Sequence, residues 1–293
     1  MAPLDEPSQT APKRIKVQRA WVGPPSGTLN NPTVWLFFLS IGGLAFGTAG
    51  YLLGRLPAAA TLAINAIAIY LVFTVMHDSM HRTAHTSRFV NDLLGRLSAV
   101  PLTVTMPLFR AVHYEHHSHT NDPARDPDLV VSRQPRWALP FWCLAVIFEY
   151  RRHYFGRRLW RDRADLVEAL LMEAVLLGVI VAAIATGTFT TIAVVWLGPA
   201  VIAVTVLALC FDFLPHYPYG SQERYLDTRI YPGRLLNVLL LGQNYHLIHH
   251  LWTTVPWYRY QRVFAEIEPE LLERGARVEW RDASTRVAPK RAG

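Results

Sequence analysis

Long uncharged stretches alternate along the chain with polar segments that are rich in arginine. Residues 33–53 and 57–76 carry no charged side chain, and the stretch 166–211 carries only Glu168 and Glu173, both near its start. A helix needs roughly 20 apolar residues to cross the hydrocarbon core of a bilayer. The first two stretches are long enough for one crossing each, and the third is long enough for two. The pattern therefore predicts four membrane-spanning helices, at about residues 33–53, 57–76, 166–186 and 189–211.

The alternative is a soluble all-α protein whose core buries these helices. Charged residues make up 17% of the 293 residues, against about 25% in a typical soluble domain. Uninterrupted apolar runs of this length also exceed what a buried core helix needs. We therefore predict an all-α integral membrane protein with four transmembrane helices in two hairpins. Residues 33–293 would form a single domain, and the Pro-rich residues 1–32 a loose cytoplasmic tail.

The basic residues fall almost entirely on one side of the predicted spans. Lys and Arg number four before the first span, thirteen between the second and third, and eleven after the fourth, against one and none in the two short turns. Positive residues stay on the cytoplasmic side of a membrane. We therefore expect a protein of the bacterial inner membrane with both termini on the cytoplasmic side. Residues 77–165 and 212–293 would form a cytoplasmic cap. Residues 97–109 and 137–148 are apolar but too short to span, which favours positions along the membrane surface.

The net charge of +7 limits the partners that this protein can have. No basic stripe interleaved with aromatic residues indicates a nucleic-acid-binding surface, so we expect no nucleic-acid partner. Anionic lipid headgroups and an acidic protein partner suit the charge better. Cys143 and Cys210 lie inside apolar segments, which argues against a disulfide framework or a thiolate metal site.

Eleven of the twelve histidines lie close to the predicted cytoplasmic ends of the spans. The sets with helical spacing are His77 and His81; His113, His116 and His117; and His246, His249 and His250. Residues at i, i+3 and i+4 share one helix face, so each set predicts a row of imidazoles that points one way. Each histidine alone could be an ordinary surface residue. Three such rows on one side of a membrane favour a metal-binding site of neutral imidazoles.

The number of histidines indicates which kind of metal site this is. A zinc ion takes three or four protein ligands, and HDSMH lacks the glutamate of the H-E-x-x-H zinc motif. Nine or more imidazoles suit two metal ions of higher coordination number that keep positions open for a small molecule. Soluble di-iron proteins build comparable sites from Glu and His on a helix bundle.

HDSMH, HYEHH and HLIHH resemble the three histidine boxes of the membrane fatty-acid desaturase and hydroxylase superfamily. The resemblance covers roughly residues 57–262. HDSMHRTAHTSRFVNDLLGRLSAV, continuing to FRAVHYEHHSHTNDPARDPD, and LLLGQNYHLIHHLWTTVPWYRYQ are most similar to carotene-ring hydroxylases of the cyanobacterial type. The resemblance implies an enzyme with two non-haem iron ions. Such an enzyme uses O₂ and two electrons to attack an unactivated C–H bond of a substrate dissolved in the lipid bilayer.

Three functions remain open at this point. The first is 3-hydroxylation of the β-ionone ring, which converts β-carotene to zeaxanthin, and the second is a fatty-acyl lipid desaturase or hydroxylase. The third is a non-enzymatic membrane metal-binding protein, which would need ionisable residues inside its spans, where only Glu173 qualifies. No nucleotide fingerprint, iron–sulfur cysteine set or HPGG haem motif is present, so we expect an external ferredoxin-like electron donor. It could dock on Arg151, Arg152, Arg157 and Arg158, although cytoplasmic topology alone also accounts for these arginines.

The predicted site combines the three boxes with one further histidine that relatives supply after their last span. The expected iron ligands are His77, His81, His113, His116, His117, His216, His246, His249 and His250. Residues that could orient these ligands or contact a metal themselves are Asp78, His85, Glu115, Asp212 and Asn244. In a helix His85 would lie about 12 Å from His77 along the axis, too far to share its ion. Asp212 stands where acyl-CoA desaturases have an Asn that holds a metal-bound water, and its role stays open, as does that of the loop NDPARDPD.

Overall fold

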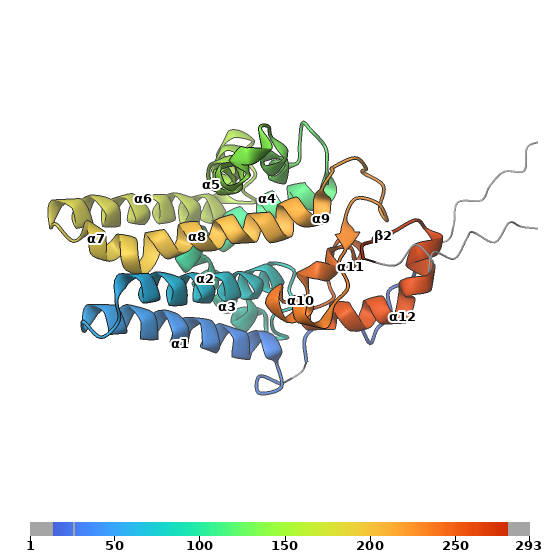
Figure 1. Ribbon diagram of the computed structural model, residues 1–293, viewed down its shortest axis with the longest axis horizontal. Helices are drawn as coiled ribbons and strands as arrows, with labels where there is room; N and C mark the ends of the chain where they lie inside the picture. Colours follow the sequence, from blue (N-terminus) through green and yellow to red (C-terminus); the bar gives the residue numbers. More distant parts are fainter. Residues whose placement is uncertain (1–13, 26, 281–293) are drawn as a thin grey trace, which may run out of the picture.

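The computed structural model describes residues 14–25 and 27–280, and these residues are mostly helical, with almost no strand. Four helices are long and apolar enough to cross a membrane, and they run side by side along the long axis of the molecule (Figure 1). They are α1 (Pro32–Leu52), α2 (Ala58–Met80), α6 (Arg163–Ala185) and the continuous helix Phe189–His216. The predicted all-α membrane fold with four spans is therefore confirmed.

The fourth span contains two π-helical segments along its length. It consists of α7 (Phe189–Ile192), the π-helical η4 (Ala193–Leu197), α8 (Gly198–Leu207), the π-helical η5 (Ala208–Phe213) and α9 (Leu214–His216). A π-helical turn inserts one residue into the helix and rotates the side chains that follow it. The second π-helical turn lies directly before His216, so it sets the direction in which that end of the span projects its side chains.

Two of the spans continue beyond the apolar residues that predict them. The second run of apolar residues ends at 76, whereas α2 ends at Met80, so His77 and Asp78 lie in its last turn. The fourth apolar run ends at 211, whereas its helix continues to His216. Neither extension contains a glycine that could end the helix, and Arg82 with φ of 60° provides the first break after α2. Hydrophobicity therefore locates the bilayer, while the helices carry ligands past its edge.

A buried asparagine connects three of the spans. The Asn65 side chain on α2 donates hydrogen bonds to Thr48 Oγ1 on α1 (3.2 Å) and to the Val195 carbonyl in η4 (2.8 Å). A Cβ atom on Gly47 would lie only 2.1 Å from Asn65 Oδ1, so α1 can approach α2 this closely only with glycine there. The Val195 carbonyl in the π-helical turn thus accepts a hydrogen bond from Asn65 inside the bundle. A backbone polar group in a membrane needs such a partner, because lipid offers none.

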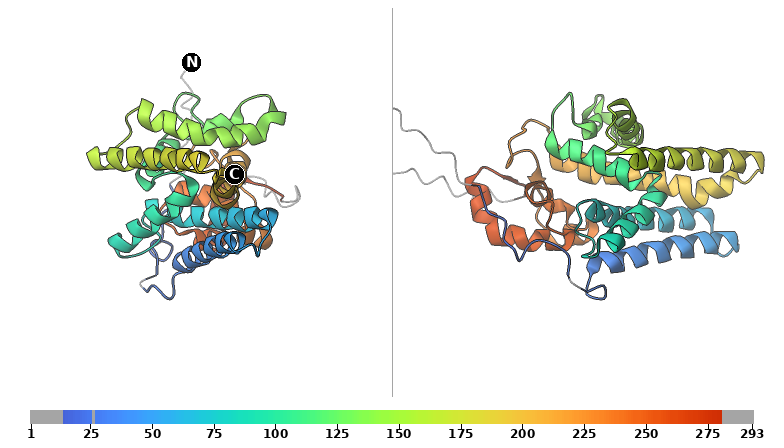
Figure 2. Two further views of the ribbon diagram at one scale, coloured as in Figure 1. Left: turned by 90° about the vertical axis from the view of Figure 1, so that its left-hand side faces the viewer. Right: turned by 180° about the vertical axis from the view of Figure 1, so that it is seen from behind.

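The remaining elements form a cap at one end of the spans (Figure 2). Between the second and third spans lie α3 (Arg88–Ala99), η1 (Val100–Leu102), α4 (Met106–Ser118), η2 (Pro127–Ser132), η3 (Arg136–Ala138) and α5 (Leu139–Gly156). After the fourth span lie β1 (Arg229–Ile230), α10 (Arg234–Leu239), η6 (Gln243–Tyr245), α11 (His246–Leu251), η7 (Trp257–Arg259), α12 (Tyr260–Glu273) and β2 (Arg277–Val278). β1 and β2 pair in parallel.

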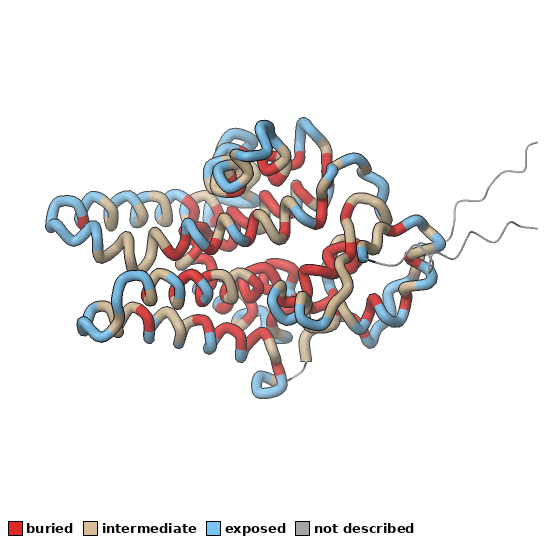
Figure 3. Tube along the Cα trace, in the orientation of Figure 1, coloured by how far each residue is buried: buried red, intermediate tan, exposed pale blue. Residues whose placement is uncertain are grey.

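Burial is concentrated where the spans meet the cap. Buried residues gather in this region, whereas the far ends of the spans are largely exposed (Figure 3). Large apolar side chains such as Phe46, Leu177 and Val181 are exposed on the flanks of the spans, as expected of surfaces that face lipid. In Figure 1, α5 points toward the viewer, across the direction of the spans, and it exposes Phe141 and Phe148. This arrangement agrees with a helix that lies along the membrane surface.

The segment that precedes the first span is partly held against the cap. Residues 1–13 of the expected loose tail lie outside the described residues, but Trp21 is buried against Trp252, with ring centroids 5.4 Å apart. Trp21 Nε1 donates to Glu266, and Arg259 donates to the carbonyls of residues 21, 22 and 23. A Pro-rich composition predicts the absence of regular structure here, and it does not reveal that a single aromatic residue fixes the segment in place.

Truncating this aromatic anchor should destabilise the cap. We expect Trp21→Ala to lower the free energy of unfolding by about 3 kcal/mol, because it removes a fully buried indole. Trp137→Ala removes an exposed indole and serves as the matched control. The measurement is thermal unfolding of the purified protein in one detergent. Equal melting temperatures for the two variants would contradict the anchoring role of Trp21.

Candidate metal centre

Four segments bring histidines together at the cap end of the spans. They are the last turn of α2, the helix α4, the end of the fourth span and the short helix α11. The position of α4 is fixed at its start, where Thr105 caps the helix by accepting a hydrogen bond from the Leu108 N–H, and Pro107 occupies its first turn. Because each histidine set has helical spacing, every segment presents its imidazoles on one face.

The histidines form two adjacent groups. His77, His81, His113 and His249 offer ring nitrogens that all lie within 4.8 Å of one another, and so do His116, His216, His246 and His250. Each group combines residues from three segments of the chain. The site therefore has room for two metal ions, each surrounded by imidazoles that only the folded protein brings together.

His117 lies between the two groups. Its Nε2 is 2.8 Å from His249 Nε2 and 2.9 Å from His113 Nε2, and its ring centroid is 4.5 Å from that of His250. All nine histidines that the sequence predicts as ligands are thus in one cluster. The shared position of His117 makes it the link between the two halves.

The opposite ring nitrogen of several histidines is held by a second protein group. His116 Nδ1 lies 2.9 Å from Asp126 Oδ1 and 3.2 Å from Asp128 Oδ2. His246 Nδ1 lies 3.0 Å from Gln243 Oε1, and His249 Nδ1 lies 3.0 Å from Tyr260 Oη. Such contacts fix the orientation of a metal-binding imidazole and leave Nε2 free to bind the ion.

Burial keeps most of these imidazoles neutral. It lowers the pKa values of His81, His113 and His117 well below 6.5, and neighbouring histidines lower them further. The same holds for His246, His249 and His250 in the other half of the site. His116 is different: burial lowers its pKa, but Asp126 and Asp128 outweigh this effect and raise it to about 10. A neutral imidazole has a lone pair available for a metal.

The arrangement fits metal ions better than a hydrogen-bonded histidine cluster. His117, His113, His249 and His77 form a chain of Nε2 atoms 2.8–3.2 Å apart. In a neutral imidazole only one nitrogen carries a proton, so such a chain cannot satisfy every nitrogen by sharing protons. Both ring nitrogens of His216 and Nε2 of His81 are buried without a hydrogen-bond partner among the described residues. Bound cations would supply the missing partners.

Three of the further candidates lie away from the cluster. His85 bonds to Thr28 and to the Ser87 N–H at the surface, as its distance along the chain from His77 suggests. Glu115 contacts His119 and Arg157 instead of a clustered histidine. Asn244 is buried and donates to the Tyr231 carbonyl (2.8 Å), which ties the residues before α11 to the β1 segment.

Asp78 and Asp212 are closer to the histidines. Asp78 Oδ1 is 3.9 Å from His77 Nδ1, and the other oxygen of the carboxylate accepts a hydrogen bond from Thr33 on α1 at 3.4 Å. Asp212 lies in the π-helical turn η5, one helical turn before His216. It interacts electrostatically with His116 and with Asp126 and Asp128, without an ion pair or hydrogen bond to any described residue.

The sequence does not assign the carboxylates that support His116. Asp126 accepts hydrogen bonds from the Asn121 and Asp128 N–H groups at 2.7 and 2.9 Å. Asn121 has φ of 63° and donates its side-chain N–H to the Ser221 and Asp227 carbonyls. The loop NDPARDPD is therefore both a tight turn and a support for the site. Its Asp-Pro-Asp motif directly after the second box is the signal that could have identified it.

An apolar pocket of about 60 Å³ adjoins the first group of histidines. Phe73 and Phe109 form part of its wall, and their rings stack on those of His77 and His113 at centroid distances of 5.9 and 5.3 Å. The remaining lining comes from α2, η1, α5 and the fourth span. The pocket therefore lies where α2 and the fourth span meet α4 and α5, directly beside the candidate metal centre.

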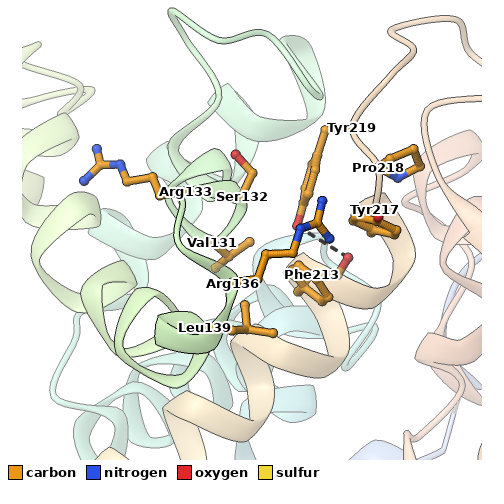
Figure 4. A pocket seen from close by; sticks show the side chains of 9 residues that line it. All are labelled: Val131, Ser132, Arg133, Arg136, Leu139, Phe213, Tyr217, Pro218 and Tyr219. Atoms are coloured by element: carbon orange, nitrogen blue, oxygen red, sulfur yellow. Dashed lines mark hydrogen bonds between the residues drawn. The ribbon is translucent and has the colours of Figure 1, made fainter.

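A second pocket, of about 180 Å³, is more polar and more remote. Its walls are Val131, Ser132, Arg133, Arg136, Leu139, Phe213, Tyr217, Pro218 and Tyr219, and none of the clustered histidines contributes to it (Figure 4). The Arg136 guanidinium lies over the Tyr217 ring, 4.5 Å from its centroid. This pocket is at the surface between η2 and the end of the fourth span, so the first pocket is the better candidate for a hydrophobic substrate.

Comparison with known proteins identifies the family to which this site belongs. The profile of the fatty acid desaturase family matches residues 52–281, which is most of the chain. The chain belongs to the fatty acid desaturase family. Membership of this family favours the two enzymatic alternatives over the non-enzymatic one considered from the sequence.

Relatives of this desaturase-family protein act on different substrates, according to their names. Dihydrorhizobitoxine desaturase of Bradyrhizobium elkanii is 29% identical over 67% of the chain and 64% of its own length. The sn-1 oleoyl-lipid 12-desaturase of Synechocystis sp. is 28% identical over 64% of the chain and 61% of its own length. The β-carotene ketolase of Paracoccus sp. is 30% identical over 64% of the chain and 71% of its own length. The chain thus spans less than two thirds of the length of the first two relatives.

Replacing any of the nine clustered histidines by Ala should lower bound iron and abolish activity, since each one would remove an imidazole from the centre. His153→Ala and His85→Ala are the matched controls, because both residues lie outside the cluster. Iron is measured per protein chain by elemental analysis. Full metal content in His117→Ala would contradict a role of this histidine in metal binding.

Asp126→Asn tests the support of His116. We expect it to weaken iron binding by about tenfold to a hundredfold, because the amide is a poorer acceptor for the His116 Nδ1–H. Asp122→Asn changes a carboxylate in the same loop that contacts only backbone N–H of Ala124, so it should leave iron binding unchanged. Equal iron affinity of the two variants in a chelator competition would refute the role of Asp126.

Proposed function

We propose that this protein catalyses the O₂-dependent oxidation of an unactivated C–H bond in a membrane-dissolved lipid. The substrate we infer is a carotenoid, and the reaction is 3-hydroxylation of its β-ionone ring, as in the conversion of β-carotene to zeaxanthin. The observation that carries the proposal is the apolar pocket whose Phe73 and Phe109 walls stack directly on the clustered histidines. Similarity to a β-carotene ketolase supports the substrate class.

The nine clustered histidines would hold two non-haem iron ions. His77, His81, His113 and His249 would surround one ion, His116, His216, His246 and His250 the other, with His117 between them. Two iron ions, when bound, supply the redox chemistry that activates O₂. The balanced reaction breaks one C–H bond, forms one C–O bond with an oxygen atom of O₂, and reduces the other atom to water with two electrons and two protons.

The residues of the chain position these components. Asp126, Gln243 and Tyr260 hold the Nδ1 atoms of His116, His246 and His249, so that Nε2 of each points to the centre. The apolar wall of the pocket excludes water from the reacting C–H bond. A flat hydrocarbon ring would enter between α2, α5 and the fourth span from the bilayer, in which the substrate is dissolved.

An acyl-lipid desaturase or hydroxylase is the second candidate. The similarity to an oleoyl-lipid 12-desaturase favours it, and an acyl chain is apolar enough for the same pocket. Both candidates place the protein in a membrane. We propose the bacterial inner membrane, with the cap and both termini on the cytoplasmic side, because the arginine-rich segments lie at that end.

We also propose that an acidic ferredoxin-like protein delivers the electrons. The four arginines that predict its docking site differ in their surroundings. Arg151 donates to Glu173 and to the Thr103 carbonyl, and Arg152 is paired with Glu149. Arg157 is half-exposed and 3.5 Å from Glu115. Arg157 also donates to the Ala124 carbonyl. Since Arg151, Arg152 and Arg157 all have protein partners, docking would depend mainly on Arg158, just after the end of α5.

Expression in cells that accumulate either β-carotene or oleoyl lipids separates the two substrate classes. We expect a 3-hydroxylated carotenoid in the pigment extract and an unchanged fatty-acid profile. His117→Ala is the control for background oxidation, because it disrupts the centre and leaves the membrane spans intact. New double bonds or hydroxyl groups in the acyl chains, with unchanged β-carotene, would overturn the carotenoid proposal in favour of the second candidate.

Turnover at limiting donor should fall as ionic strength rises from about 20 to about 150 mM, because salt screens charge-driven docking. Arg158→Gln should lower the rate at low salt and reduce this dependence, whereas Arg55→Gln, in the turn at the opposite end of the spans, should do neither. Rates at saturating donor serve as the reference. A rate at limiting donor that does not respond to salt would rule out electrostatic docking.

A further inference from the structure

The apolar pocket beside the histidines contains three polar side chains. They are Tyr150 and Arg151 on α5 and Asp212 in the π-helical turn η5 of the fourth span. The other lining residues are hydrocarbon or thioether side chains, such as Met76, Leu102 and Val204. A polar group that lines an apolar pocket is costly unless it forms hydrogen bonds. The partners of these three residues therefore indicate what the pocket binds.

Two of the three polar groups already have protein partners. Arg151 forms an ion pair with Glu173 and donates to the carbonyls of Thr103 and Ile147. The Tyr150 hydroxyl hydrogen-bonds to Asp128, in the loop that supports His116. These contacts hold α5 against the rest of the protein, so neither side chain is available to a substrate.

Asp212 has no such partner. Among the described residues, none donates a hydrogen bond to its carboxylate and none forms an ion pair with it. The nearby charges that act on it are mostly the carboxylates of Asp126 and Asp128, which repel rather than pair with it. The π-helical turn that carries Asp212 is a local departure from the α-helix, of a kind often found at functional sites. This turn presents an acceptor to the pocket and leaves it unsatisfied.

We propose that Asp212 accepts a hydrogen bond from a hydroxyl group that the substrate already carries. This inference rests on the proposed function and narrows its substrate class. The preferred substrate is a carotenoid whose end ring bears a hydroxyl on the carbon next to the oxidised position, rather than a hydrocarbon ring. A hydroxyl can donate to either form of a carboxyl group, since both forms have an acceptor oxygen.

The proposal also implies an order of two oxygenation reactions on the same ring. A hydrocarbon ring offers no donor to the Asp212 side chain, whereas a hydroxylated ring does. A preceding oxygenation of the ring must therefore supply the preferred substrate, and this enzyme adds the second oxygen. Because the hydrogen bond forms at one edge of the ring, it also fixes which methylene group faces the histidines.

The experiment compares two carotenoids with the full-length, iron-loaded protein in detergent micelles. β-Carotene has hydrocarbon rings, and β,β-carotene-4,4′-diol carries a hydroxyl beside each C3. We expect kcat/KM to be roughly tenfold higher for the diol with the wild-type protein, the effect of one buried hydrogen bond. Asp212→Asn keeps a weaker acceptor and should retain a preference of about threefold, and Asp212→Leu should reduce it to about twofold or less.

The ratio of the two kcat/KM values cancels any general loss of activity in a variant. Leu207→Val changes an apolar residue of the same pocket and should leave the ratio as in the wild type. A wild-type ratio of one or below, or a preference that survives in Asp212→Leu, would overturn the inference while leaving the carotenoid function in place. Loss of bound iron in both Asp212 variants would overturn it too, by assigning Asp212 to the metal. Conversion of neither carotenoid would refute the proposed function and this inference with it.

Discussion

The site depends on fixing several of its imidazoles by the nitrogen that does not face the centre. Nine imidazoles in a buried cluster have no stable arrangement if their rings can rotate, because neighbouring Nε2 atoms lie as close as 2.8 Å. Contacts to Nδ1, such as those of Asp126 to His116 and Tyr260 to His249, select one tautomer and one orientation. Burial then keeps most of the rings neutral by lowering their pKa values. The cap supplies these Nδ1 partners from three separate segments, which contain Asp126, Gln243 and Tyr260.

The sequence predicts the fold and the histidine cluster because both follow from periodicity. Apolar length specifies the spans, and the spacing of His113, His116 and His117 specifies one face of a helix. The groups that orient the histidines follow no such rule. Asp126 reaches His116 through a tight turn in which Asn121 is left-handed, and that geometry depends on contacts with residues more than 90 positions away. The sequence does not reveal the anchoring of Trp21 either, because its partners Trp252 and Glu266 lie near the other end of the chain.

Hydrophobicity does not predict where two of the membrane-spanning helices end. His77 and His216 belong to membrane helices by geometry, although the apolar stretches end before them. A helix that continues past the bilayer edge carries a ligand on a rigid element rather than on a loop, and rigid elements hold ligands more accurately. The spans are therefore part of the metal centre as well as its anchor, and a change in how α1, α2 and the fourth span pack would move the ligands directly.

This continuity also couples the pocket to the centre. Phe73 stacks on His77, one turn further along the same helix, and Phe109 has the same relation to His113 on α4. Phe73 and Phe109 contact each other at 5.5 Å, so one aromatic pair separates the apolar pocket from two of the histidines. Any ring or chain that fills the pocket must rest against this pair. In the proposed reaction, the distance between the C–H bond and the centre would thus be set by two phenylalanines, whose positions are fixed by the helices that carry the histidines.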